Sequence, residues 1–237
     1  MTPEDRARLA ANLQAVRERI AAAATRAGRD PASVRLIAVT KYVESSVMRE
    51  LLALGCHDLG EARPQALWSK QVELADVADS IRWHFIGHLQ RNKLGRTLEQ
   101  VSLLHSGDRW DLLAAADEFA AAQRRSIPAL IEVNISGDGT KHGFRPDEIV
   151  NLGKRLAELK HVDVRGLMGM SSLEGDLNSA RREFARLREL REQARASWPA
   201  SLSLNELSMG MSGDFEVAIE EGATAVRVGS ALYEGIA

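Results

Sequence analysis

The chain has 237 residues, of which 45% are hydrophobic and 27% charged, and its formal net charge is −2 at pH 7. This balance gives no general attraction to nucleic acid or to a membrane surface, and no apolar run approaches the ~18 residues of a membrane span. Cys56 is the only cysteine, which excludes an intrachain disulfide and favours a reducing compartment. The first residues are polar and carry no leader pattern, so we expect a cytoplasmic protein.

A helix is expected before any strand. Thr2 is a suitable N-cap, and Pro3 suits the first helical position, where its missing N–H costs nothing. Apolar residues then repeat at helical spacing, namely Leu9, Leu13, Val16 and Ile20. Gly28 is a typical residue to end the helix.

Eight short apolar runs follow and alternate with segments of helical spacing. The expected strands are 34–39, 57–60, 82–86, 102–106, 128–135, 162–168, 202–209 and 225–229. The expected helices are one from 45 or 46 to 54, and then 64–77, 93–100, 110–123, 146–159, 178–196 and 215–221, and a short segment at 231–235 finishes the chain. Such an alternation indicates the α/β class with a parallel sheet.

Two arrangements satisfy eight alternating strands and helices: a (β/α)8 barrel and a doubly wound open sheet. The segment after the first strand lacks the Gly-rich turn that is typical of the open sheet. Gly- and Ser-rich turns instead follow the seventh and eighth strands, where barrels commonly bind phosphate. We therefore predict a single (β/α)8 TIM barrel with an extra N-terminal helix, forming one domain over residues 1–237.

The two late turns, 208–214 and 226–232, each follow a strand and open a helix. Glycine lets backbone N–H groups approach a ligand closely, serine adds a hydroxyl donor, and a helix start offers unpaired N–H groups. Together the turns predict an anion site, and a phosphate is the expected anion.

Lys41 directly follows the first expected strand, so its amine would lie at the mouth where the strands of a barrel end. An amine held away from water loses its proton more readily and can attack an aldehyde. The alternative is an ordinary lysine that reaches solvent. Beside a phosphate site, such a lysine provides the two contacts that pyridoxal 5′-phosphate (PLP) needs. Arg227 on the eighth strand can face the pyridine nitrogen, or else form an ion pair.

The sequence resembles the YggS-type pyridoxal-phosphate homeostasis proteins, which share the barrel of the alanine racemase N-terminal domain. Motifs along nearly the whole chain carry the resemblance: 38–41 (AVTK), 60–63 (GEAR), 83–93 (WHFIGHLQRNK), 105–109 (HSGDR), 133–136 (VNIS), 165–168 (RGLM), 207–214 (LSMGMSGD) and 226–229 (VRVG). The third-strand motif and the serine–methionine–glycine motif are the most specific of them.

The resemblance implies which residues hold PLP. Lys41 would form the Schiff base, Arg227 would face the ring nitrogen, and the phosphate would lie on Ser208, Met209, Gly229 and Ser230. Asn134 and Met168, at the ends of the fifth and sixth expected strands, complete the expected cofactor-binding set. The family usually has asparagine where this chain has Ala62, which implies that one polar contact near the ring is missing.

No metal site is expected. His84 and His88 are four residues apart, but they flank the end of a strand, where this spacing does not bring two side chains to one ligand. Cys56 is expected to be a packed residue and not a nucleophile. The Arg-rich helix 178–196 keeps helical apolar spacing, which favours a solvated face over nucleic-acid binding.

Two functions remain open at this point. The first is a PLP-binding homeostasis protein without substrate turnover, with apo PLP-dependent enzymes as its expected partners and a monomer as its expected state. The second is a racemase-like enzyme, which needs a second acid or base on the opposite face of the ring. In alanine racemase that group is a tyrosine from a partner subunit's second domain, whereas this sequence has only Tyr42 and Tyr233 and stops four residues after Tyr233. We therefore favour the first function and expect no catalytic residue.

Overall fold

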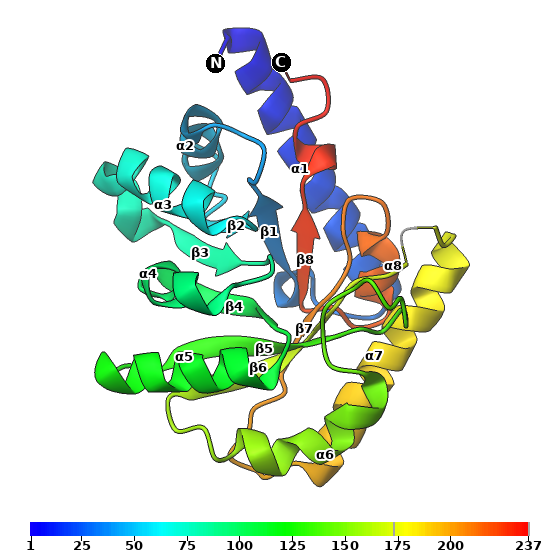
Figure 1. Cartoon of the computed structure of the whole chain (residues 1–237). Coiled ribbons are helices and arrows are strands. Elements are labelled where there is room, and N and C mark those ends of the chain that lie inside the picture. The colour runs from blue at the N-terminus through cyan, green and yellow to red at the C-terminus, as the bar shows by residue number, and fades with distance from the viewer. Residues whose placement is uncertain (173, 237) are drawn as a thin grey trace.

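The computed structural model describes residues 1–172 and 174–236. Leu173 and Ala237, which the expected domain 1–237 includes, lie outside the described residues. The strands are β1 (Arg35–Val39), β2 (Asp58–Glu61), β3 (Arg82–Phe85), β4 (Val101–Gly107), β5 (Ile127–Val133), β6 (Val162–Gly169), β7 (Glu206–Ser208) and β8 (Ala225–Val228). They pair in chain order into a closed parallel barrel (Figure 1), so the predicted (β/α)8 fold is confirmed.

Helices surround the barrel (Figure 1): the first precedes β1, one follows each of β1 to β7, and, of the residues described, only a 3₁₀ turn follows β8. They are α1 (Pro3–Arg26), α2 (Ser45–Ala53), α3 (Pro64–Glu73), α4 (Leu94–Leu98), α5 (Trp110–Ala122), α6 (Pro146–Leu156), α7 (Leu177–Ser197) and α8 (Phe215–Glu220). Short 3₁₀ turns are η1 (Pro31–Ser33), η2 (Ala75–Ser80), η3 (Arg91–Lys93) and η4 (Ser230–Leu232). In the described part of the chain, no helix is both long and apolar enough to cross a membrane.

Several predicted boundaries differ from the structure by one to four residues, and three of them show why. The strand expected at 202–209 begins only at Glu206, because the Leu202 N–H closes a turn onto the Pro199 carbonyl at 3.0 Å. The helix expected at 64–77 ends at Glu73 and continues as η2 with a kink at Val77. The fifth strand ends at Val133, since the next residue's N–H bonds to the Phe144 carbonyl of the returning loop.

The extra N-terminal helix α1 begins at the predicted cap, where the Thr2 hydroxyl accepts the Asp5 N–H at 3.1 Å. Its apolar face is buried, and it packs against α8 and η4. Asn12 Nδ2 donates to the carbonyls of Leu232 (3.1 Å) and Glu234 (3.0 Å). These contacts hold the C-terminal turn against the helix, and both ends of the chain lie at the same end of the molecule (Figure 1).

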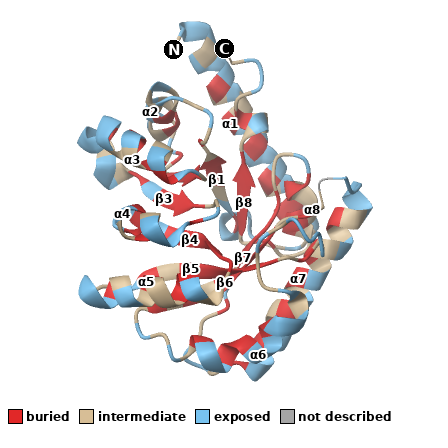
Figure 2. Ribbon diagram, in the orientation of Figure 1, coloured by how far each residue is buried: buried red, intermediate tan, exposed pale blue. Residues whose placement is uncertain are grey.

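Closure of the barrel fixes which residues become neighbours. β8 pairs with β1 in the register Ile37 to Arg227, so the strand carrying Arg227 lies beside the strand that leads to Lys41. The main core lies between the strands and the inward faces of the helices, where the buried residues concentrate (Figure 2). A second, small cluster of Leu103, Leu130 and Met168 fills part of the barrel interior.

Candidate functional site

A cavity of about 1010 Å³ opens at the end of the barrel where the strands finish. It brings together four residues of the predicted site, Lys41, Arg227, Gly229 and Ser230. The other lining residues include Ala62, Ile86, Met170, Met211, Ser212, Gly213 and Tyr233. The cavity therefore lies at the closing seam of the barrel, between β1 and β8.

Lys41 reaches this cavity from the end of β1. The preceding residue, Thr40, continues the strand by donating its N–H to the Gly60 carbonyl at 2.8 Å. The Lys41 ammonium lies 5.0 Å from the centre of the Tyr42 ring, and the Lys41 carbonyl accepts a hydrogen bond from Arg63. The lysine is thus carried on a rigid strand while its side chain stays at the cavity wall.

A second lysine lies behind this strand end and was not predicted. Lys70 on α3 is 8% exposed, and its ammonium donates to the Thr40 carbonyl (2.7 Å) and to Glu61 Oε2 (2.6 Å). Lys70 follows Pro64 and Leu67 at steps of three residues, so it shares the buried face of α3, and this spacing could have identified it from the sequence. Because these two bonds tie its ammonium to Thr40 and Glu61, Lys70 supports the β1–β2 end, whereas Lys41 lines the cavity.

The two Gly- and Ser-rich turns are joined through Ser212. Its hydroxyl oxygen accepts the N–H groups of Gly229 (3.1 Å) and Ala231 (3.3 Å). The first turn depends on Gly210, which has φ +93°; a Cβ there would lie 2.6 Å from the Cβ of Ala218. Glycine is therefore required for the turn to pass so close to α8. Ser212 was not in the predicted cofactor set, although it lies within the motif.

Ser208 and Met209 are both fully buried and do not line the cavity. The Ser208 hydroxyl lies 2.9 Å from His105 Nδ1 and accepts from Arg227 Nη1 at 2.5 Å. The Met209 N–H donates to the Ala225 carbonyl at 3.1 Å. Three other residues of the same motif, Met211, Ser212 and Gly213, line the cavity instead. Phosphate binding by Ser208 and Met209 stays a prediction.

Asn134 and Met168 also lie away from the cavity wall. The Asn134 amide donates to the Asp138 carbonyl at 2.7 Å and accepts the Gly137 N–H at 3.1 Å, so it shapes the loop after β5. Met168 is 1% exposed and packs inside the barrel beneath Met170, which does line the cavity. Their role in cofactor binding likewise stays a prediction.

Arg227 forms the inner wall of the cavity. It is 4% exposed, and its Nη2 donates to the Gly169 carbonyl at 3.0 Å. Burial lowers the pKa of its guanidinium to about 10, against the opposing charges of Glu132 and Asp214. The side chain therefore keeps its positive charge at neutral pH, in an orientation fixed by two acceptors.

A line of hydrogen bonds crosses the barrel interior to Arg227. It runs from Asp58 to His84 Nε2 (2.9 Å), from His84 Nδ1 to His105 Nε2 (2.9 Å), and on to Ser208. Burial, followed by the charges of His84 and Arg227, keeps the pKa of His105 well below its usual value. Because the Asp58 carboxylate only accepts, His84 Nε2 donates to it, and at the other end of the line Ser208 accepts from Arg227 Nη1.

The carboxyl of Asp58 closes this line at the opposite end of the barrel. Burial opposes its ionisation, but hydrogen bonds from His84 and Arg82 outweigh that effect and lower its pKa far below the ordinary range. Arg82 binds it through two nitrogens, at 2.9 and 2.6 Å. The charged Asp58 therefore fixes the first histidine of the line, and the line in turn holds Ser208.

Glu132 is a further buried acid that was not predicted from the sequence. It lies on β5, is 5% exposed, and has a pKa raised to about 7 by burial and then by Asp108, while Arg227 acts in the opposite direction. Its position could have identified it, because Glu132 is a single acid within the otherwise apolar strand Ile127–Val133. The barrel interior near Arg227 thus contains a carboxyl group that is mostly protonated below about pH 7.

Comparison with known proteins gives a consistent result. The alanine racemase N-terminal domain family matches residues 11–236 of the chain. A pyridoxal phosphate homeostasis protein of Pseudomonas aeruginosa is 39% identical over 225 residues, which are 95% of this chain and 94% of that protein. The Aquifex aeolicus protein of the same name is 40% identical over 221 residues, covering 93% and 95% of the two chains.

A solved structure agrees with the sequence relatives. PipY of Synechococcus elongatus PCC7942, in a structure with PLP bound, superposes with a TM-score of 0.83 at 33% identity. The match covers 95% of this chain and 99% of that one.

Proposed function

The chain belongs to the alanine racemase N-terminal domain family, among its pyridoxal phosphate homeostasis proteins, and we propose that it binds PLP as a Schiff base on Lys41 and serves PLP homeostasis without substrate turnover. The observation that carries the proposal is the closing seam of the barrel, where Lys41 and Arg227 come from adjacent strands and line one cavity. The proposal places this role in the cytoplasm, in a monomer that passes PLP to apo-enzymes.

The residues of the cavity fit the cofactor. A Cβ added at Gly213 would meet no atom within 4 Å, so the turn after β7 leaves open space at the cavity wall. Ser212 holds that turn against Gly229 and Ala231, which brings two backbone segments to one side of the cavity. These segments are where the phosphate would bind, because backbone N–H groups and hydroxyls suit a doubly charged anion.

When bound, PLP supplies an electrophilic aldehyde. The Lys41 amine would form the C–N bond with its carbon, and water would leave. Arg227 would face the ring nitrogen, and its retained charge disfavours protonation of that nitrogen, which weakens electron withdrawal by the ring.

The alternative is a racemase-like enzyme, and Tyr233 is the residue to consider for it, because it lines the same cavity as Lys41. Burial raises the pKa of its phenol far above the ordinary value, and no described residue hydrogen-bonds its hydroxyl. A phenol in that state is a poor base at neutral pH. Two relatives matched over 94% and 95% of their own lengths are named for homeostasis, and this supports the proposal over the alternative.

Borohydride reduction tests the lysine directly. Purified protein incubated with PLP should retain a reducible chromophore, and mass spectrometry of the digest should find the adduct on the peptide that contains Lys41. Lys41→Ala should lose the adduct, whereas the matched control Lys154→Ala, on the exposed face of α6, should keep it. An adduct of equal yield in Lys41→Ala would refute the assignment.

A second assay separates the two functions. The protein with PLP bound should cause no inversion of L-alanine or other amino acids above the rate of free PLP. Stereoinversion that disappears in Lys41→Ala would refute the non-enzymatic proposal and favour the racemase-like one. Gel filtration of the same sample checks the monomer, and reactivation of an apo PLP-dependent enzyme checks the transfer.

A further inference from the structure

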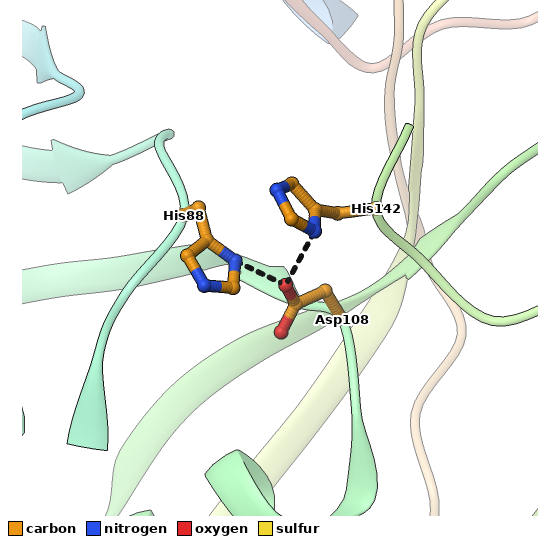
Figure 3. A group of neighbouring side chains, drawn as sticks. All are labelled: His88, Asp108 and His142. Atoms are coloured by element: carbon orange, nitrogen blue, oxygen red, sulfur yellow. Dashed lines mark hydrogen bonds and ion pairs between the residues drawn. The ribbon is translucent and has the colours of Figure 1, made fainter. Parts of the chain in front are cut away.

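Three side chains from separate loops meet at the rim of the barrel mouth. His88 follows β3, Asp108 follows β4, and His142 lies in the loop after β5 (Figure 3). His88 Nδ1 is 2.7 Å from Asp108 Oδ2, and His142 Nδ1 is 3.9 Å from the same oxygen. In the sequence His88 and His84 are four residues apart, but His84 lies inside the barrel, bonded to Asp58 and His105.

The distances suit a small cation. One ligand atom from each residue lies within 4.8 Å of the other two. In a tetrahedral zinc site with bonds of about 2.0–2.1 Å, neighbouring ligand atoms are about 3.4 Å apart. The side chains of His88 and His142 are 36% and 58% exposed, so small rotations of two accessible rings would reach that geometry without moving the barrel.

The neighbouring groups hold these ligands in orientation. Asp108 Oδ1 accepts from Arg109 Nη1 at 2.7 Å, which leaves Oδ2 directed at the two histidines (Figure 3). Arg109 is itself held by the Leu89 carbonyl at 2.8 Å. The rings of His88 and His142 stack with centroids 4.0 Å apart and planes at 20°, each with a nitrogen turned toward the carboxylate. Such second contacts are typical of groups that orient metal ligands.

We propose that His88, Asp108 and His142 bind one divalent transition-metal ion of the zinc class. Two imidazoles and one carboxylate favour Zn²⁺ or Co²⁺ over Mg²⁺ and Ca²⁺, which prefer all-oxygen sites. Three protein ligands leave a fourth position for water or an added ligand. Arg109 Nη1 also lies 3.5 Å from His88 Nδ1, so this positive neighbour should limit the dissociation constant to the order of micromolar.

The proposed ion would join three segments at the edge of the PLP cavity. His88 lines a depression together with Ala62 and Arg63, and Ala62 also lines the cavity of Lys41. His142 belongs to the loop after β5, which is also held by hydrogen bonds of Asn134 to the Asp138 carbonyl and of Lys141 to the Ser171 carbonyl. A bound ion would therefore fasten this loop to the ends of β3 and β4, next to the cofactor.

Calorimetric titration with ZnCl₂ tests the site on the tag-free full chain, with PLP removed. One Zn²⁺ should bind per chain, and excess Mg²⁺ should not displace it. His142→Ala and Asp108→Asn should each weaken binding at least tenfold, whereas the control His161→Ala should bind as the parent does. Co²⁺ should give the visible absorption of a tetrahedral ion, and this band should disappear in His142→Ala.

The following results would overturn the proposal. It fails if no saturable binding occurs near one equivalent, or if His142→Ala binds Zn²⁺ as tightly as the parent. His142 is an exposed loop residue, so its replacement leaves the fold intact, and a circular-dichroism melt checks this. Binding that occurs only when the titration is repeated with PLP added, and that is lost in Lys41→Ala, would place the ion on the cofactor instead. Because the titration omits PLP, it is independent of the proposed function.

Discussion

Replacing Glu132 by glutamine should change how the stability of the protein depends on pH. Glu132 is almost fully buried on β5, and its pKa is raised from 4.5 to about 7 by burial and by Asp108. In the unfolded chain this carboxyl ionises above about pH 4.5, whereas in the folded protein it keeps its proton until about pH 7. Between these values the unfolded state binds fewer protons, so the free energy of unfolding falls as the pH rises.

The size of the effect follows from the shift. A rise of the pKa from 4.5 to about 7 corresponds to about 3 kcal/mol, at about 1.4 kcal/mol per pH unit. This stability is present below pH 4.5 and lost by about pH 7. Glutamine resembles the protonated carboxyl in shape and hydrogen bonding but does not titrate. Glu132→Gln should therefore match the parent at low pH and exceed it by about 3 kcal/mol above pH 7.

Urea denaturation of both proteins without PLP, at pH 5 and pH 8, measures this difference. The gap between mutant and parent should widen by about 2.5 kcal/mol between the two conditions, because a small part of the effect is already present at pH 5. Glu189→Gln on the exposed face of α7 serves as the matched control and should show no widening. A gap that stays constant with pH, or a Glu132→Gln protein that is less stable than the parent at pH 8, would refute the reasoning.

Three further changes test other parts of the site. Gly210→Ala should lower the free energy of unfolding by at least ~2 kcal/mol, because φ +93° and the contact with Ala218 exclude a Cβ; a melting temperature equal to the parent's would contradict this. Ser212→Ala removes the acceptor shared by two N–H groups and should weaken PLP binding about tenfold in a fluorescence titration, whereas an unchanged dissociation constant would place the phosphate elsewhere. Burial raises the pKa of the Cys56 thiol to about 11, so Ellman's reagent should react with it at pH 8 only after denaturant is added, and rapid labelling of the folded protein would show that the thiol is accessible.

Much of the fold follows from local patterns. The apolar runs and helical spacings gave all eight strands and their order, because each strand and helix must bury one face whatever its partners are. The Gly- and Ser-rich turns after β7 and β8 were visible because only particular residues adopt such turns. The errors lie at the ends of strands and helices, as at Glu206 and Glu73, where a turn or a 3₁₀ segment competes with continuation.

Part of the candidate site could likewise be predicted from the sequence, and part of it depended on the tertiary structure. The sequence alone determined that Lys41 ends a strand and that Arg227 lies on the last one, which is enough to place both at the seam of a closed barrel. Only the tertiary structure decided where neighbouring side chains point. In a strand, successive residues face opposite sides, so a motif does not tell whether the Ser208 hydroxyl faces the cavity or His105 in the interior.

Contacts between segments that are distant in the chain could not be predicted from the sequence either. Asp108 and His142 meet His88 only because three loops that follow consecutive strands converge at one rim. Ser212 joins the two late turns only once β8 lies beside β7. Such contacts depend on strand register and loop path, which local residue preferences leave undetermined and which closure of the barrel fixes.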